Sequence, residues 1–243
     1  MRVLPFAKRC AHEILRDPIN LIFGLGFPLI LLLLLSAIQA NIPVELFAIG
    51  TLAPGITVFG LSFMTLFSAT LIARDRESAF LQRLYATPLT GADFILGYML
   101  PLLPIAIAQA VICYLFALLL GLPLSIHILY AILGVIPIAV FNIALGLLCG
   151  SVLNVKQVGG ICGALLTNLS AWLSGVWFDL KLVGGFFEKL ANVFPFVHAV
   201  EMERAFLSGN WELAAAQLLP VLLYGTAITA AAIFCFLRQM KGQ

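Results

Sequence analysis

The sequence predicts an all-α membrane protein with six transmembrane helices. Of its 243 residues, 63% are hydrophobic and only 10% are charged, whereas a soluble domain carries about 25% charged residues. The apolar residues also gather into runs of about 20, the length that a membrane-spanning helix needs. Because a backbone inside lipid must satisfy its own hydrogen bonds, such runs form helices. We therefore expect a single transmembrane domain over residues 1–243.

The first expected element is an amphipathic helix within residues 1–17. Val3, Phe6, Cys10 and Ile14 recur at helical spacing in VLPFAKRCAHEILRDP, with charged residues between them. This pattern predicts a helix that lies in the membrane surface, in contact with lipid.

Six apolar runs follow, each long enough to cross the bilayer. They are Ile19–Gln39, Ile49–Ala73, Phe94–Leu120, Ile128–Leu153, Val158–Phe178 and Leu213–Leu237. Several contain prolines, which predict kinks that neighbouring helices accommodate.

A charged strip, RDRESAFLQRLYATP, begins at Arg74 and interrupts the apolar pattern after the second run. Written as a helix, it places Phe80 with Leu84, and Leu81 with Tyr85, on one apolar face. The strip over residues 74–88 therefore predicts a short amphipathic helix. It either rests on lipid headgroups or docks into a partner protein.

The strip also contains its own stop signal. Pro88 forbids continuation of the helix and pushes Thr87 towards extended geometry. Thr90 or Asp93 can then cap the next helix, which leads into the third run.

Positive charge predicts the orientation, because cytoplasmic loops of membrane proteins are enriched in Lys and Arg. Of the 13 Lys and Arg residues, the other-side connections hold only Lys181, Lys189 and Arg204. We therefore expect both termini and the charged strip in the cytoplasm. The ten residues on that side are Arg2, Lys8, Arg9, Arg16, Arg74, Arg76, Arg83, Lys156, Arg238 and Lys241.

Ionisable residues are scarce within the predicted spans. There is no Asp, Glu, Lys or Arg between Phe94 and Val155, or between Ala214 and Leu237. Transporters coupled to ions usually carry such groups at membrane depth. The pattern therefore favours energy supplied by a partner and argues against an intramembrane enzyme. A stand-alone secondary multidrug transporter is the alternative.

Other sequence features exclude several partners. A net charge of +2 gives no support for nucleic-acid binding. The five cysteines form no Cys-x-x-Cys pair, so we expect no metal and no cofactor.

Four polar residues lie inside the spans, and two glycine patterns accompany them. Most of the polar side chains are expected to bond neighbouring helices, and some to line a translocation path. The pairs Gly146/Gly150 and Gly159/Gly163 allow close helix approach, either within the chain or at a dimer seam. The polar residues are Gln109, Asn142, Thr167 and Asn168.

The charged strip resembles the signature of ATP-binding-cassette (ABC) type-2 permeases. Asp75-Arg76-Glu77 matches the acidic-Arg-Glu start of that signature, and Leu81, Leu84 and Thr87-Pro88 match its end. Ala79 and Gln82 stand where the signature has glycine and glutamate, and Phe80 where threonine is usual.

A second stretch, FPFVHAVEMERAFLSGNW, resembles the element that precedes the last span of these permeases. Pro195, Glu201, Arg204 and Gly209 match it. Glu201 and Arg204 are three residues apart and are expected to pair on an exposed helix face.

The resemblance implies a specific machine. The N-terminal helix would be an elbow helix, residues 179–212 an outside segment that dips back into the membrane, and residues 74–88 a coupling helix. The chain has no GxxxxGK[ST] phosphate loop, so ATP would be hydrolysed by a separate cytoplasmic ABC ATPase and not by this chain. Contacts with that ATPase would involve Arg74, Asp75, Arg76, Glu77, Phe80, Leu81, Arg83, Leu84, Thr87 and Pro88.

The same resemblance implies that two permease subunits, identical or paralogous, pair in a plasma membrane and export cargo. The apolar character of the spans suggests a hydrophobic or amphipathic cargo that is drug-like or lipid-like.

Overall fold

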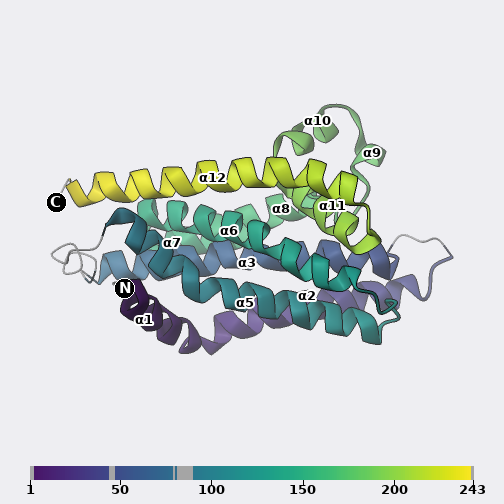
Figure 1. Cartoon of the computed structure of the whole chain (residues 1–243), viewed down its shortest axis with the longest axis horizontal. Helices are drawn as coiled ribbons and strands as arrows, with labels where there is room; N and C mark the ends of the chain where they lie inside the picture. Colours follow the sequence, from purple (N-terminus) through teal and green to yellow (C-terminus); the bar gives the residue numbers. More distant parts are fainter. Residues whose placement is uncertain (1–2, 44–46, 79, 81–89, 242–243) are drawn as a thin grey trace.

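The computed structural model describes residues 3–43, 47–78, 80 and 90–241, and this part of the chain is all-helical (Figure 1). Five of its helices are long and apolar enough to cross a membrane. They are α2 (Pro18–Gln39), α3 (Ile49–Glu77), α5 (Gly91–Leu119), α6 (His127–Val152) and α12 (Trp211–Lys241). These five helices correspond to the first, second, third, fourth and sixth runs of the sequence.

Local signals in the sequence set the starts of two of these helices. Asp17 caps α2, and Pro18 occupies the first turn, where a missing N–H is harmless. Thr90 caps α5 in a reciprocal arrangement with Asp93, because each side chain accepts a hydrogen bond from the other residue's backbone N–H. The predicted restart at Thr90 is therefore confirmed.

The expected fifth crossing differs from the prediction. The structure has no single α-helix over Val158–Phe178. Three elements instead follow one another without a break: α7 (Val155–Val158), the π-helix η1 (Gly159–Leu166) and α8 (Thr167–Leu173). Glycines at 159, 160 and 163 weaken the α-helical preference of this stretch, and a π-helix has a wider turn. The helical backbone ends at Leu173, so a sixth transmembrane helix is not confirmed.

Helix α3 is the centre of the bundle, and nearly all of its side chains between Leu52 and Ala73 are buried. It packs against α2, α5, α6 and α11. Gly146 and Gly150 of α6 face it: a Cβ at Gly146 would collide with Ser68 and the Thr65 carbonyl. The first glycine pair therefore serves close packing within the chain. By contrast, nothing within 4 Å faces Gly159.

The remaining helix at the N-terminus, α1 (Val3–Leu15), buries Phe6, Ala7, Cys10 and Ile14. It lies across the bundle at the end where both chain termini are found (Figure 1). Phe6 contacts Phe94 and Tyr98 of α5, with ring centroids 5.7 and 4.9 Å apart. We call this end of the bundle the α1 end.

The opposite end, the α11 end, holds α9 (Leu180–Val183), α10 (Gly185–Val193) and α11 (Pro195–Ser208) (Figure 1). These helices occupy the segment expected outside the membrane. Helix α11 packs on α12, α6 and α3. It ends at Gly209, whose φ of 75° is left-handed and favours glycine.

Candidate functional site

The charged residues Arg74 to Glu77 form the last turn of α3, and this turn is the candidate site. The sequence predicted a separate short helix beginning at Arg74, but α3 continues through Glu77 and is capped at Ser78. The continuation is possible because neither proline nor glycine occurs between Leu61 and Ser78. The side chains of this turn bond residues from several neighbouring helices.

Asp75 is the buried member of the turn, with 1% of its surface exposed. Its two carboxylate oxygens accept hydrogen bonds from the Arg9 guanidinium of α1, at 2.5 and 2.6 Å. The Tyr98 hydroxyl of α5 donates to the same carboxylate at 2.7 Å. A two-pronged arginine pair fixes geometry as well as charge. Asp75 therefore ties α1, α3 and α5 together at the α1 end.

Arg9 compensates the charge of the buried Asp75 carboxylate. It also pairs with Glu13 at 2.6 Å, and its guanidinium lies 4.1 Å from the centroid of the Phe80 ring. Burial by itself would lower the pKa of Arg9, but its hydrogen bond to Asp75 and the charges of Asp75 and Glu13 outweigh burial and raise it. Burial raises the pKa of Glu13, with Asp75 adding to the effect and Arg9 opposing it.

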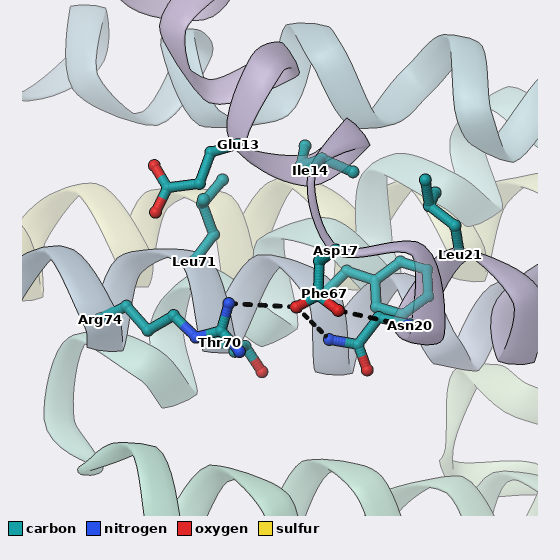
Figure 2. Close-up of a pocket in the computed structure, with 9 residues that line it drawn as sticks. All are labelled: Glu13, Ile14, Asp17, Asn20, Leu21, Phe67, Thr70, Leu71 and Arg74. Carbon is teal, nitrogen blue, oxygen red and sulfur yellow. Dashed lines mark hydrogen bonds and ion pairs between the residues drawn. The ribbon is translucent and has the colours of Figure 1, made fainter.

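Arg74 points towards the junction of α1 and α2. Its guanidinium lies 3.0 Å from the carboxylate of Asp17, which also accepts hydrogen bonds from Asn20 (Figure 2). These groups line a small cavity of about 30 Å³, together with the apolar side chains of Phe67 and Leu71. Figure 2 draws the residues that line it. The cavity is too small for a cargo molecule, so the role of Arg74 here is to join α3 to α2.

Arg76 and Glu77 contact the junction between α6 and α7. Arg76 donates hydrogen bonds to the carbonyl oxygens of Gly150 and Leu153, at 2.9 and 3.2 Å. Glu77 accepts one from the backbone N–H of Val155 at 2.9 Å. The arginine satisfies carbonyls at the end of α6, and the carboxylate satisfies an N–H at the start of α7. The charged strip was expected to rest on lipid headgroups or to dock into a partner protein, but Arg76 of that strip packs against α6 of the same chain.

Together, these contacts make the last turn of α3 a connection point for α1, α2, α5, α6 and α7. Sequence reasoning singled out Arg74 to Glu77 but missed Arg9 and Tyr98, which complete the buried cluster. The remaining predicted contacts, Leu81, Arg83, Leu84, Thr87 and Pro88, lie outside the described residues.

A comparison of the sequence with known protein families identifies the family of this chain. Residues 4–208 match the family described as ABC-2 type transporter. The chain belongs to the ABC-2 type transporter family. The match covers most of the chain and extends from α1 to the end of α11. A search of curated proteins gave no match.

The polar residues expected along a path in this ABC-2 permease do not form one group. Gln109 donates to the Thr57 carbonyl, and Asn142 accepts from Thr65, so both link α3 to a neighbouring helix. Thr167 and Asn168 instead bond carbonyls one turn earlier, within their own helical segment.

Of the four, Asn142 lines a cavity of about 10 Å³ between α3, α6, α8 and α11. The Oε1 atom of Gln109 is buried and has no hydrogen-bond partner. These contacts fit the helix-bonding role that the sequence favoured for most of the four residues.

The second motif contains a different arrangement from the one expected. Arg204 does not pair with Glu201 on an exposed face: it donates to the carbonyl oxygens of Thr51 and Gly175, at 3.2 Å each. Burial lowers the pKa of Arg204, with Glu201 and Asp179 opposing the effect. Arg204 thereby holds α11 to the start of α3 and to the turn after α8.

A larger cavity, of about 520 Å³, opens beside Arg204 at the α11 end. Its size is within the range of small-molecule sites. Acidic and basic side chains share its wall: Asp179, Lys181, Glu188, Glu201 and Arg204.

Proposed function

We propose that this ABC-2 permease is the membrane subunit of an ABC exporter, and that a separate cytoplasmic ATPase drives it through the end of α3. Two copies, or one copy and a paralogue, would form the transport unit in the plasma membrane. The α1 end and both termini would face the cytoplasm, and the α11 end would face outward.

The observation that carries this proposal is the cluster around Arg74 to Glu77. A motor can move a bundle only where a displaced group is linked to several helices. The last turn of α3 bonds α1, α2, α5, α6 and α7 through side chains. It directly precedes the segment whose sequence resembles a coupling helix. Movement of that segment would therefore be passed through the last turn of α3 to the five helices that it bonds.

The charge distribution supports the proposed orientation. Arg9, Arg74 and Arg76 belong to the α1 end, whereas the Lys and Arg of the α11 end are few. Positive charge favours the cytoplasmic side. The helix α1, with apolar residues buried against α5 and charged ones around them, would act as the elbow at the inner membrane surface.

The cargo would be hydrophobic or amphipathic, drug-like or lipid-like. Helices α2, α5 and α12 expose many large apolar side chains, including Ile22, Leu115 and Phe234. Such surfaces suit contact with lipid, with a second subunit or with an apolar cargo.

Transport by inverted membrane vesicles tests the proposal. Vesicles carrying the chain and its ATPase should accumulate a lipophilic dye when ATP is supplied, and Leu84→Asp should abolish this uptake while the protein is still inserted. Leu182→Asp, an exposed leucine at the α11 end, is the matched control and should leave uptake unchanged.

The same assay separates the exporter from its alternative. Uptake driven by an ion gradient without nucleotide would establish a stand-alone secondary transporter. Uptake that survives both Glu77→Ala and Leu84→Asp would contradict the role assigned to the end of α3.

A further inference from the structure

A second buried carboxyl group lies far from the α1 end, on α11. Glu203 has 0% of its surface exposed, although it lies between Glu201 and Arg204, which were expected to pair on an exposed helix face. Helix α11 is not one of the five helices that could cross the membrane. A fully buried acid is rare unless it has a partner that compensates its charge.

Glu203 has one neutral partner. Its Oε1 atom accepts a hydrogen bond from the Tyr114 hydroxyl of α5 at 2.7 Å. Its Oε2 atom is buried and has no hydrogen-bond partner. That atom faces Gly134 of α6, where an added Cβ would lie 3.0 Å from it. The carboxyl group is thus enclosed between α5, α6 and α11.

No cation reaches this carboxyl group from the described residues of the surrounding helices. Arg204, its neighbour in sequence, donates to Thr51 and Gly175 instead. Helix α3 has no titratable residue between Ile49 and Ala73.

Titratable groups on the other helices have different contacts. On α6, the ring of His127 packs near Gly209 and Trp211. On α12, Glu212 is exposed and the Tyr224 hydroxyl donates to Val193. On α5, Cys113 bonds Gln109.

Ionisation at such a position is unfavourable. A carboxylate removed from water needs a cation or several donors, and Glu203 has one neutral hydroxyl. Burial therefore raises the pKa of Glu203 to about 8, and the Tyr114 hydrogen bond only partly opposes this. At neutral pH the protonated form predominates.

We propose that Glu203 is a proton-binding site, and that the bound proton keeps α11 seated against α5 and α6. The site is closed, and none of the three cavities described above has Glu203 in its wall. A proton is therefore the ligand that fits. Loss of the proton would place a charge in an apolar seam, and α11 would move towards water to hydrate it.

Helix α11 would therefore act as a gate at the α11 end, seated while Glu203 is protonated and released when it ionises. Because α11 also holds the start of α3 through Arg204, release of α11 would loosen the α11 end as a whole. Proton binding by Glu203 does not depend on the proposed export function. Only the assignment of the proton to the outside of the membrane depends on it, because that proposal places the α11 end outward.

Infrared spectroscopy of the purified permease in lipid nanodiscs tests proton binding directly. The C=O stretch of a protonated carboxyl group should be present at pH 6 and should disappear with a midpoint near pH 8. Glu203→Gln should remove this band, and Tyr114→Phe should shift its frequency because the hydrogen bond to Oε1 is lost. Glu201→Gln, on the same helix, is the matched control and should leave the band in place. A spectrum of the folded wild-type protein with no such band at pH 6 overturns the proposal.

Hydrogen–deuterium exchange tests the seating of α11. Amides of residues 195–208, corrected for the intrinsic pH dependence of exchange, should become less protected between pH 6 and pH 9 in the wild type. In Glu203→Gln, which cannot ionise, protection should not change over that range. Equal protection of the wild type at both pH values would refute the gate even if the carboxyl band titrates.

Discussion

Replacing Asp75 by asparagine removes the charge that holds Arg9 and keeps the size of the side chain. The substitution leaves the Arg9 guanidinium without its main partner at a site where Asp75 is 1% exposed. Removing one member of a buried ion pair destabilises a protein by about 3–5 kcal/mol. The Arg9 side chain is 34% exposed and regains some hydration, so we expect a loss of about 2–3 kcal/mol.

The assay is unfolding of the purified permease by sodium dodecyl sulfate in mixed micelles, followed by circular dichroism. Asp17→Asn is the matched control, because it breaks the exposed pair with Arg74 while asparagine still caps α2. That control should lose less than about 1 kcal/mol. Combining Asp75→Asn with Arg9→Gln should cost much less than the sum of the two single changes. Equal losses for Asp75→Asn and Asp17→Asn would refute the argument that the buried cluster secures α1.

Three further outcomes follow from the glycine packing, from Glu203 and from the hydrogen bond between Tyr98 and Asp75. Gly146→Leu should force α6 away from α3 and destabilise the protein by about 1–3 kcal/mol or more. Gly159→Leu is the control and should leave the melting temperature unchanged, because nothing within 4 Å faces Gly159. Equal melting temperatures for the two variants would contradict the close packing of α6 on α3. We expect Glu203 to keep its proton in the folded state up to about pH 8, whereas in the unfolded state it releases the proton above pH 4.5. The free energy of unfolding should therefore fall as pH rises from 4.5 to about 8, by roughly 5 kcal/mol in total. Glu203→Gln should lack this fall, and melting curves from pH 5 to 9 that superimpose for the two proteins would rule it out. Tyr98→Phe removes a hydrogen bond to the charged Asp75 and should cost about 1.5–3 kcal/mol in the detergent titration, and an unchanged unfolding curve would argue against that bond.

The sequence was a reliable guide wherever one local rule dominated. Hydrophobic length located α2, α3, α5, α6 and α12 to within a few residues, because length is the main requirement for crossing lipid. The cap at Thr90 followed from the chemistry of its side chain. The membership of the family followed from a motif and was confirmed by the match over residues 4–208.

Tertiary contacts set the features that the sequence could not supply. Asp75 looked like a surface charge, and only the approach of α1 and α5 reveals it as buried. Arg204 seemed suited to Glu201, three residues away, but backbone carbonyls of α3 and of the turn after α8 are its partners. The segment around Gly159 read as one apolar span, and its glycines instead give a π-helix. Nothing in the sequence indicated that Glu203 is buried, because its burial depends on the packing of α5, α6 and α11.

The uninterrupted run of α3 has a mechanical consequence. At 1.5 Å per residue, its 29 residues measure about 43 Å from Ile49 to Glu77. Had the helix broken at Ala73, a force applied beyond that break would have been absorbed by a flexible joint. As one continuous helix, with Asp75 and Arg76 anchored near one end and Thr51 held by Arg204 near the other, it would transmit a twist or a thrust from the α1 end to the α11 end with little slack.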